Sequence, residues 1–177
     1  MDHRLRTNNS LKSVDDLVDH DLVAPELRQE LEDVSARYAI AITPAMLELI
    51  DPDDPNDPIA RQFLPDVREL DQHSSEKADP IGDGPMTKTP GLVHRYPDRV
   101  LLKLVDVCPV YCRFCFRREM VGPKQQGQLP DADIENALAY IAAHEEIWEV
   151  IVTGGDPLML LSLIHISEPT RPNAPSR

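Results

Sequence analysis

The chain has 177 residues, a length typical of one domain with a sizeable hydrophobic core. Its formal net charge of −13 argues against a nucleic-acid or anionic-membrane partner, because such partners are bound through Lys and Arg. No apolar run approaches the ~20 residues that a membrane span needs, and the polar start predicts no signal peptide, so we expect a cytoplasmic protein.

Residues 1–90 are predicted to form a helical and irregular N-terminal extension. Ser13 and Asp16 have the spacing of a helix-capping box, and a second helix is predicted from Pro25. This second helix places three apolar side chains on one face, namely Leu27, Leu31 and Val34. The prolines of residues 51–58 predict a turn that ends the helical part. Residues 61–90 show no clear periodicity and are either an ordered wrap or a flexible arm.

A strand, a loop, a helix and a second strand are predicted next. Residues 100–105 are mostly apolar, as in a strand that is buried on both faces. The following helix, residues 130–144, carries one apolar stripe made of Ile134, Ala137, Leu138 and Ile141. Residues 149–152 predict the second strand, which the helix can return parallel to the first. The loops after both strands then share the edge where α/β proteins bind ligands.

All three cysteines lie in the segment 107–118, here called the cysteine loop, with the spacing C-x3-C-x2-C. The spacing also fits one face of a helix with buried cysteines, although Pro109 would then have to lie in its first turn. A closed zinc site needs four ligands, and no fourth Cys or His follows nearby. Thiolates also ligate iron–sulfur clusters, and three of them on a four-iron cluster would leave one iron open to a further ligand.

Basic residues gather around the cysteine loop in an otherwise acidic chain. Between His94 and Lys124 there are seven Lys or Arg residues against three acidic ones. Planar guanidinium groups suit carboxylates and phosphates, so this basic segment predicts small anionic ligands. The alternative is a set of solvated surface charges.

Four motifs in this order resemble the lysine 2,3-aminomutases and their relatives. They are residues 50–55, residues 90–100, the cysteine loop and residues 153–157. The resemblance implies an α/β fold in which residues 91–160 form the first βα units of a partial (β/α) radical S-adenosylmethionine (SAM) barrel. Residues 1–90 would precede this barrel as the helical extension.

The resemblance also implies a radical-initiating site. The thiolates of three cysteines, Cys108, Cys112 and Cys115, would hold a [4Fe–4S] cluster that binds SAM. Reductive cleavage of SAM would then give a 5′-deoxyadenosyl radical. The family's SAM-contacting loop matches Gly154, Gly155 and Asp156. Glycines allow close backbone approach, although a plain turn would also contain them. Phe114 either packs beside the adenine or belongs to the core.

A second set of matches concerns pyridoxal phosphate (PLP) and the substrate. Arg95, Tyr96 and Arg99 match the site that binds the PLP phosphate, and both residue types are suitable donors to a phosphate. Without the resemblance, these arginines would be interpreted as surface ion pairs. Arg117 matches the residue that holds the carboxylate of lysine, with an exposed arginine as the alternative.

The implied activity is an isomerase reaction that converts L-lysine to β-lysine. We expect a small-molecule substrate, an electron donor such as flavodoxin or ferredoxin, and a homo-oligomer at full length. One alternative is the relative that makes β-lysine for elongation factor P. The other is an iron–sulfur binding or electron-transfer module, against which the glycine and arginine motifs argue.

The chain departs from the family toward its carboxyl end. The lysine that anchors PLP and the acidic residues for the distal amine of the substrate lie far downstream in the family, and neither is found here. Residues 161–177 look like translated sequencing-adapter sequence, with a native tail as the alternative, so we expect a non-native tail on an inactive, truncated fragment. Such a fragment would leave apolar faces and a strand edge uncovered.

Overall fold

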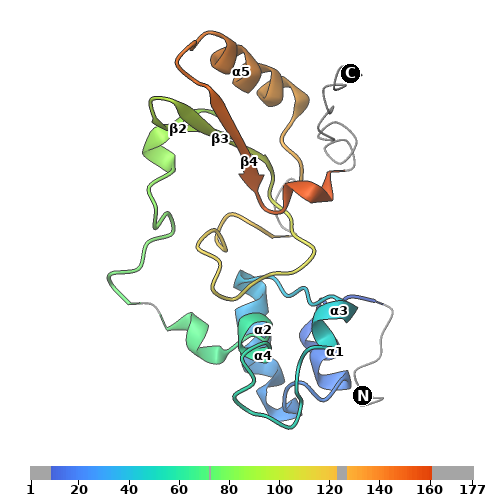
Figure 1. The fold of residues 1–177 in the computed structure, drawn as a ribbon. Helices are drawn as coiled ribbons and strands as arrows, with labels where there is room; N and C mark the ends of the chain where they lie inside the picture. Colours follow the sequence, from blue (N-terminus) through green and yellow to red (C-terminus); the bar gives the residue numbers. More distant parts are fainter. Residues whose placement is uncertain (1–8, 72, 123–126, 161–177) are drawn as a thin grey trace, which may run out of the picture.

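The computed structural model describes residues 9–71, 73–122 and 127–160. Helices form the N-terminal part, a four-stranded sheet forms the other part, and the cysteine loop lies between them (Figure 1). The expected tail, residues 161–177, lies outside the described residues. Within the described ranges, no helix is long and apolar enough to cross a membrane.

Residues 9–71 contain four short α-helices: α1 (Val14–Asp19), α2 (Arg28–Arg37), α3 (Pro44–Leu47) and α4 (Ala60–Phe63). The predicted capping box is present, because the Ser13 side chain accepts from the Asp16 amide at 3.1 Å. Leu31 and Val34 are buried, as predicted for one face of the second helix. Leu27 is exposed, because it ends the preceding 3-10 turn η2 (Pro25–Leu27) and lies before α2.

Residues 61–90 form an ordered wrap over most of their length. The chain passes through α4, the 3-10 helices η3 (Val67–Leu70) and η4 (Gly84–Met86), and the short strand β1 (Thr87–Thr89). Position 72 lies outside the described residues. Of the two alternatives left by the sequence, the structure therefore supports the ordered wrap.

The sheet has the order β1-β2-β3-β4, with β2 spanning Leu92–Tyr96, β3 Arg99–Val105 and β4 Glu149–Gly154. Strands β3 and β4 are parallel and are joined through α5 (Asp131–Ala142), so the predicted strand–loop–helix–strand unit is confirmed. The antiparallel pairs β1–β2 and β2–β3 were not predicted. β2 ends in the polar residues His94, Arg95 and Tyr96, which hide its strand pattern.

One face of β3 carries the core of the sheet. Val100, Leu102 and Leu104 are buried in a cluster that includes Ala137 of α5, with Ile134 and Ile141 packed against it. Alternate residues of β3, Leu101 and Lys103, are only half-buried, so the prediction of burial on both faces is wrong. The predicted helix stripe is likewise too wide, because Leu138 is exposed.

β4 is the outer strand of the described sheet and carries apolar side chains in contact with solvent. Val150, Ile151 and Val152 are all exposed. This agrees with the expectation of an uncovered apolar strand. The continuation of the sheet into a barrel stays a prediction.

Candidate functional site

The cysteine loop is held between the sheet and the N-terminal helices by backbone hydrogen bonds. The Tyr111 amide donates to the Ala41 carbonyl at 3.1 Å, and the Arg113 amide donates to the Gln62 carbonyl at 2.8 Å. No helix occurs in this loop, all of whose residues are described, so the buried-helix interpretation of the cysteines is wrong. The N-terminal extension therefore forms one wall of the site.

Glu69 is the main side-chain link between the cysteine loop and the N-terminal helices. Its carboxylate accepts from Arg113 Nε and NH2 at 3.0 and 2.8 Å, and Arg118 NH1 lies 3.4 Å away. The Arg113 and Glu69 side chains are only 8% and 12% exposed. Arg113 and Arg118 thus position the loop, which corrects the interpretation of the whole basic segment as a set of ligand-binding groups.

The three cysteines are free and line one small cavity of about 60 Å³. Burial raises the pKa of the Cys108 thiol, and a hydrogen bond from the Asp156 backbone opposes this shift. Burial also raises the pKa of Cys112, with a further contribution from the charge of a Cys115 thiolate. In the described ranges no three His, Cys, Asp or Glu side chains are arranged to hold a single metal ion. Three free thiols around a shared cavity nevertheless fit the donor set of an iron–sulfur cluster.

Gly154 and Gly155 bring the loop after β4 against the start of the cysteine loop. The Gly155 amide donates to the Val105 carbonyl at 2.7 Å, and the Asp156 amide donates to the Val107 carbonyl at 3.0 Å. A Cβ at Gly154, whose φ is +120°, would overlap the Val105 carbonyl oxygen. The glycines are therefore required by the packing of two backbones. The Asp156 side chain caps the 3-10 helix η5 (Pro157–Met159).

The three residues matched to the PLP phosphate come from the β2–β3 hairpin. Tyr96 pairs with Arg99 across the hairpin, and a register shift precedes Tyr96 in β2. His94 hydrogen-bonds to Tyr140 of α5 at 2.9 Å, so without the shift Tyr96 would face α5 as well. The irregularity thus turns Tyr96 to the side of Arg99, away from α5.

Both arginines of this set are already paired in the structure. Arg99 donates from Nε and NH2 to the Asp98 carboxylate at 3.0 and 2.9 Å. Arg95 donates to the Ile81 carbonyl, and its NH2 lies 3.5 Å from Asp83 Oδ1. Across the described contacts, the three residues share no common partner. Their joint role toward a phosphate stays a prediction.

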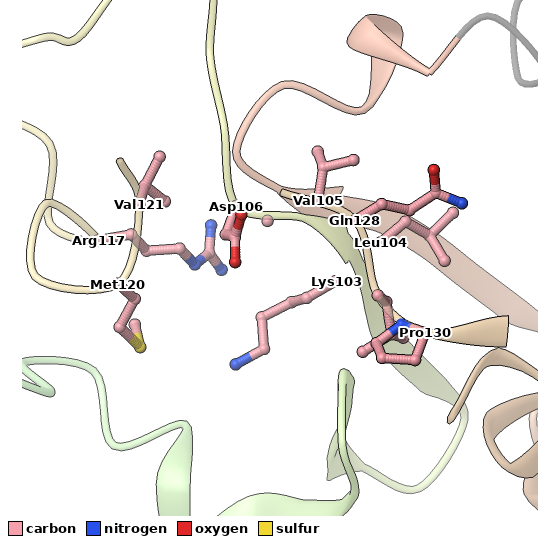
Figure 2. Close-up of a pocket in the computed structure, with 11 residues that line it drawn as sticks. Lys103, Leu104, Val105, Asp106, Arg117, Met120, Val121, Gln128 and Pro130 are labelled. Carbon is pink, nitrogen blue, oxygen red and sulfur yellow. The ribbon is translucent and has the colours of Figure 1, made fainter. Parts of the chain in front are cut away.

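Arg117 lies beside a cavity of about 170 Å³ at the carboxyl end of β3 (Figure 2). Its NH1 donates to Thr153 Oγ1 of β4 at 3.4 Å, and its NH2 lies 3.7 Å from Asp83 Oδ2. The side chain is only 13% exposed, so the interpretation of Arg117 as an exposed arginine is wrong. Arg117 also stacks on Phe116, with 4.6 Å from Cζ to the ring centroid.

Phe114 points into solvent, with 68% of its surface exposed. The interpretation of Phe114 as a core residue is therefore wrong. Its proposed place beside an adenine stays a prediction.

Sequence reasoning missed Glu69 and Asp83, and it gave no individual role to Lys103 of the basic segment or to Thr153 of the motif 153–157. A further signal was available for Lys103, because it interrupts an otherwise apolar strand. Asp83 was interpreted as part of a turn, yet only 1% of it is exposed. Its partners lie on β2, β3 and the cysteine loop, and no local pattern connects these segments.

Comparisons with known proteins show what the segment around the cysteine loop is similar to. The sequence profile of the radical SAM superfamily matches residues 102–171, which include the cysteine loop, α5 and β4. The chain is 36% identical to the L-lysine 2,3-aminomutase of Clostridium subterminale over 159 residues. It is 37% identical to a putative L-lysine 2,3-aminomutase of Aquifex aeolicus and 34% identical to the glutamate 2,3-aminomutase of Clostridioides difficile.

These similarities cover most of this chain but less than half of each relative. The Clostridium subterminale alignment covers 90% of the chain and 38% of the relative. The corresponding shares are 86% and 41% for the Aquifex aeolicus protein, and 89% and 37% for the Clostridioides difficile protein.

Proposed function

We propose that this chain, which matches the radical SAM superfamily over residues 102–171 and resembles curated 2,3-aminomutases, is part of an enzyme that converts L-lysine to β-lysine. One observation carries this proposal. The three cysteines and the Gly154–Asp156 loop meet at the carboxyl ends of two parallel strands. This is the edge at which α/β proteins bind ligands.

Each candidate residue then has a defined task. The [4Fe–4S] cluster is held by the thiolates of Cys108, Cys112 and Cys115. The SAM site is bordered by the backbone of the glycine loop, which consists of Gly154, Gly155 and Asp156. Phe114, exposed next to two of the cysteines, is available to stack on the adenine. When bound, the cluster and SAM would supply a radical initiator, and PLP would supply a carrier for the amino group.

The remaining candidates bind anionic groups. Arg117 binds the substrate carboxylate, because its guanidinium is largely buried at a cavity and retains unused donors. Arg95, Tyr96 and Arg99 bind the PLP phosphate. Since Asp83 and Asp98 already contact the two arginines, a phosphate at this site has to compete with these carboxylates.

The test is anaerobic reconstitution of the purified chain with iron and sulfide, followed by electron paramagnetic resonance with and without SAM. We expect an iron–sulfur spectrum that changes when SAM is added. Cys108→Ala should abolish cluster binding, whereas the exposed Ser74→Ala should leave it intact. A spectrum unchanged by SAM would contradict the radical SAM proposal, and zinc without iron would contradict the cluster.

The choice of substrate needs a separate assay, because the relatives include both lysine and glutamate 2,3-aminomutases. We propose free L-lysine. Turnover by the complete protein should be compared on L-lysine and L-glutamate, and β-lysylation of elongation factor P should be measured separately to distinguish the free-lysine enzyme from the elongation-factor relative. We also propose a flavodoxin or ferredoxin electron donor, a homo-oligomer and a cytoplasmic location for the complete protein.

A further inference from the structure

Three cations from different parts of the chain converge on the buried carboxylate of Asp83. Arg95 NH2 of β2 lies 3.5 Å from Oδ1, Lys103 Nζ of β3 lies 3.9 Å from Oδ2, and Arg117 NH2 lies 3.7 Å from Oδ2. Asp83 itself is anchored in the wrap, because its amide donates to Asp79 Oδ1 at 2.9 Å. The wrap therefore delivers one negative charge to a site that three elements supply with positive charge.

Lys103 and Arg117 line the same cavity of about 170 Å³. Figure 2 shows their side chains extending toward one another from opposite sides of it. Lys103 pairs in register with Thr153, which accepts a hydrogen bond from Arg117. Both cations approach the same oxygen of Asp83, so they are close enough to contact one bound anion.

The charged groups in and beside this cavity are not fully satisfied by hydrogen bonds within the protein. Among the described residues, Asp83 Oδ2 and Arg117 Nε are buried without a hydrogen-bond partner. Buried charged groups without partners are costly, and such sites are expected to gain partners from a ligand. A donor on Arg117 is thus available to an incoming oxygen atom.

The local charge favours a ligand with one negative charge. Asp106 also lines the cavity, and its Oδ1 accepts from the Gly127 amide at 2.8 Å. The charged residues of the lining are therefore Lys103 and Arg117 against Asp106, which leaves one positive charge in excess. A single carboxylate would balance it.

We propose that Lys103 is a second ligand for the substrate carboxylate beside Arg117, and that Asp83 is the positioning residue that aligns both cations. Lys103 supplies a compact ammonium group, whereas Arg117 supplies a planar pair of donors. This inference rests on the proposed function and deepens it, because it adds a second ligand from β3, Lys103, and a positioning residue from the wrap, Asp83, to the carboxylate site of Arg117.

Calorimetry on the complete purified chain tests the role of Lys103 with two probes. L-Lysine carries the carboxylate, and 1,5-diaminopentane has the same carbon skeleton without it. We expect L-lysine to bind more tightly than the diamine. Lys103→Met should weaken L-lysine binding about tenfold and leave diamine binding unchanged, since a charge-assisted hydrogen bond is lost.

Two further variants complete this experiment. Lys103→Arg should retain most of the affinity, and Lys88→Met, at an exposed lysine of β1, should bind like the wild type. An unchanged affinity for L-lysine in a folded Lys103→Met chain would overturn the proposal, as would an equal loss for both probes or no binding of L-lysine by the wild type.

The role of Asp83 needs a spectroscopic readout, because a merely structural residue could also weaken binding. In the wild type, L-lysine should shift the Nε–H resonance of Arg117 in spectra of arginine-labelled protein. Asp83→Asn preserves the size of the side chain, and in a folded variant this shift should be lost while the Arg37 resonance is unaffected. An Arg117 response unchanged by Asp83→Asn would overturn the positioning role.

Neither measurement depends on the cluster. A normal response of the cluster to SAM combined with L-lysine binding that Lys103→Met leaves unchanged would refute only this inference. Conversely, a failed cluster test combined with the expected binding pattern would refute the radical SAM proposal and leave the carboxylate site in place.

Discussion

Glu69 connects the cysteine loop to the N-terminal helices through an ion pair that is largely removed from solvent. Breaking such a pair by neutralising one partner leaves a buried charge uncompensated. We expect Glu69→Gln to lower the free energy of unfolding by roughly 3 kcal/mol in urea denaturation at pH 7. Glu48→Gln, at an exposed position after α3, should change it by less than about 0.5 kcal/mol. Equal effects of the two variants would mean that Glu69 does not hold the loop.

The close packing of Gly154, at the end of β4, can be tested by a comparison within the chain. Gly154 and Gly127 both have positive φ, +120° and +86°, but only Gly154 lies against other backbone, whereas a Cβ at Gly127 would meet nothing within 4 Å. Both alanine variants carry backbone strain of about 1–3 kcal/mol. Gly154→Ala should be clearly more destabilising in thermal unfolding, because its Cβ also displaces Val105. Similar melting temperatures for the two variants would contradict the close approach.

Single residues were predictable where their chemistry is local. The cysteine spacing and the Ser13 capping box can be recognised from neighbouring positions, and the capping box is confirmed. Phe114 could not be assigned, because its exposure depends on which segments cover the loop. Asp83 was missed for the same reason, since its three cationic partners are remote in sequence.

At the level of elements, Asp98 ties the β2–β3 turn to the chain that enters β4. The Asp98 carboxylate accepts hydrogen bonds from Arg99 and, at 3.1 Å, from the Trp148 indole. The Arg99 hydrogen bond first and the Trp148 hydrogen bond second hold the pKa of Asp98 well below its usual value. A lowered pKa stabilises the fold above the unfolded pKa of about 3.9, and this contribution is lost as the pH falls through the lowered value.

This gives a pH-dependent prediction for the hairpin. The melting temperature of Asp98→Asn should lie below that of the wild type by a constant amount between pH 8 and pH 5. The difference should shrink in more acidic solution, as the wild-type carboxylate becomes protonated. Asp33→Asn, at an exposed position of α2, serves as the control and should show no such difference. A gap that widens in acid would contradict the assignment.

The elements themselves were predicted unevenly. β3, α5 and β4 have strong apolar patterns, and all three are present with shifts of a few residues at their ends. β1 and β2 were missed because β1 has only three residues and β2 changes from apolar to polar halfway. Strands of this kind form through pairing with β3, which local sequence does not encode.

For the whole molecule, the exposed apolar face of β4 predicts self-association of the chain as it stands. Edge strands with apolar side chains are templates for further pairing. We expect Ile151→Lys to increase the monomeric fraction in size-exclusion chromatography with light scattering. Leu49→Lys removes a comparably exposed apolar side chain far from the sheet and should not change it. An equal effect of both substitutions would point to general hydrophobicity instead of this strand.

The sequence by itself determined the kind of chemistry, because three cysteines at fixed spacing, a glycine pair and a set of arginines are local patterns that limit the possible ligands. It also determined the parallel β3–β4 unit through apolar periodicity. Only the tertiary structure decided which charges serve the fold and which face a cavity. Arg113 and Arg117 are four residues apart in one loop, yet one is neutralised by Glu69 and the other faces Asp83 and Lys103. The physical reason is that an ion pair depends on distance in space and on burial, and both are set by packing between remote segments.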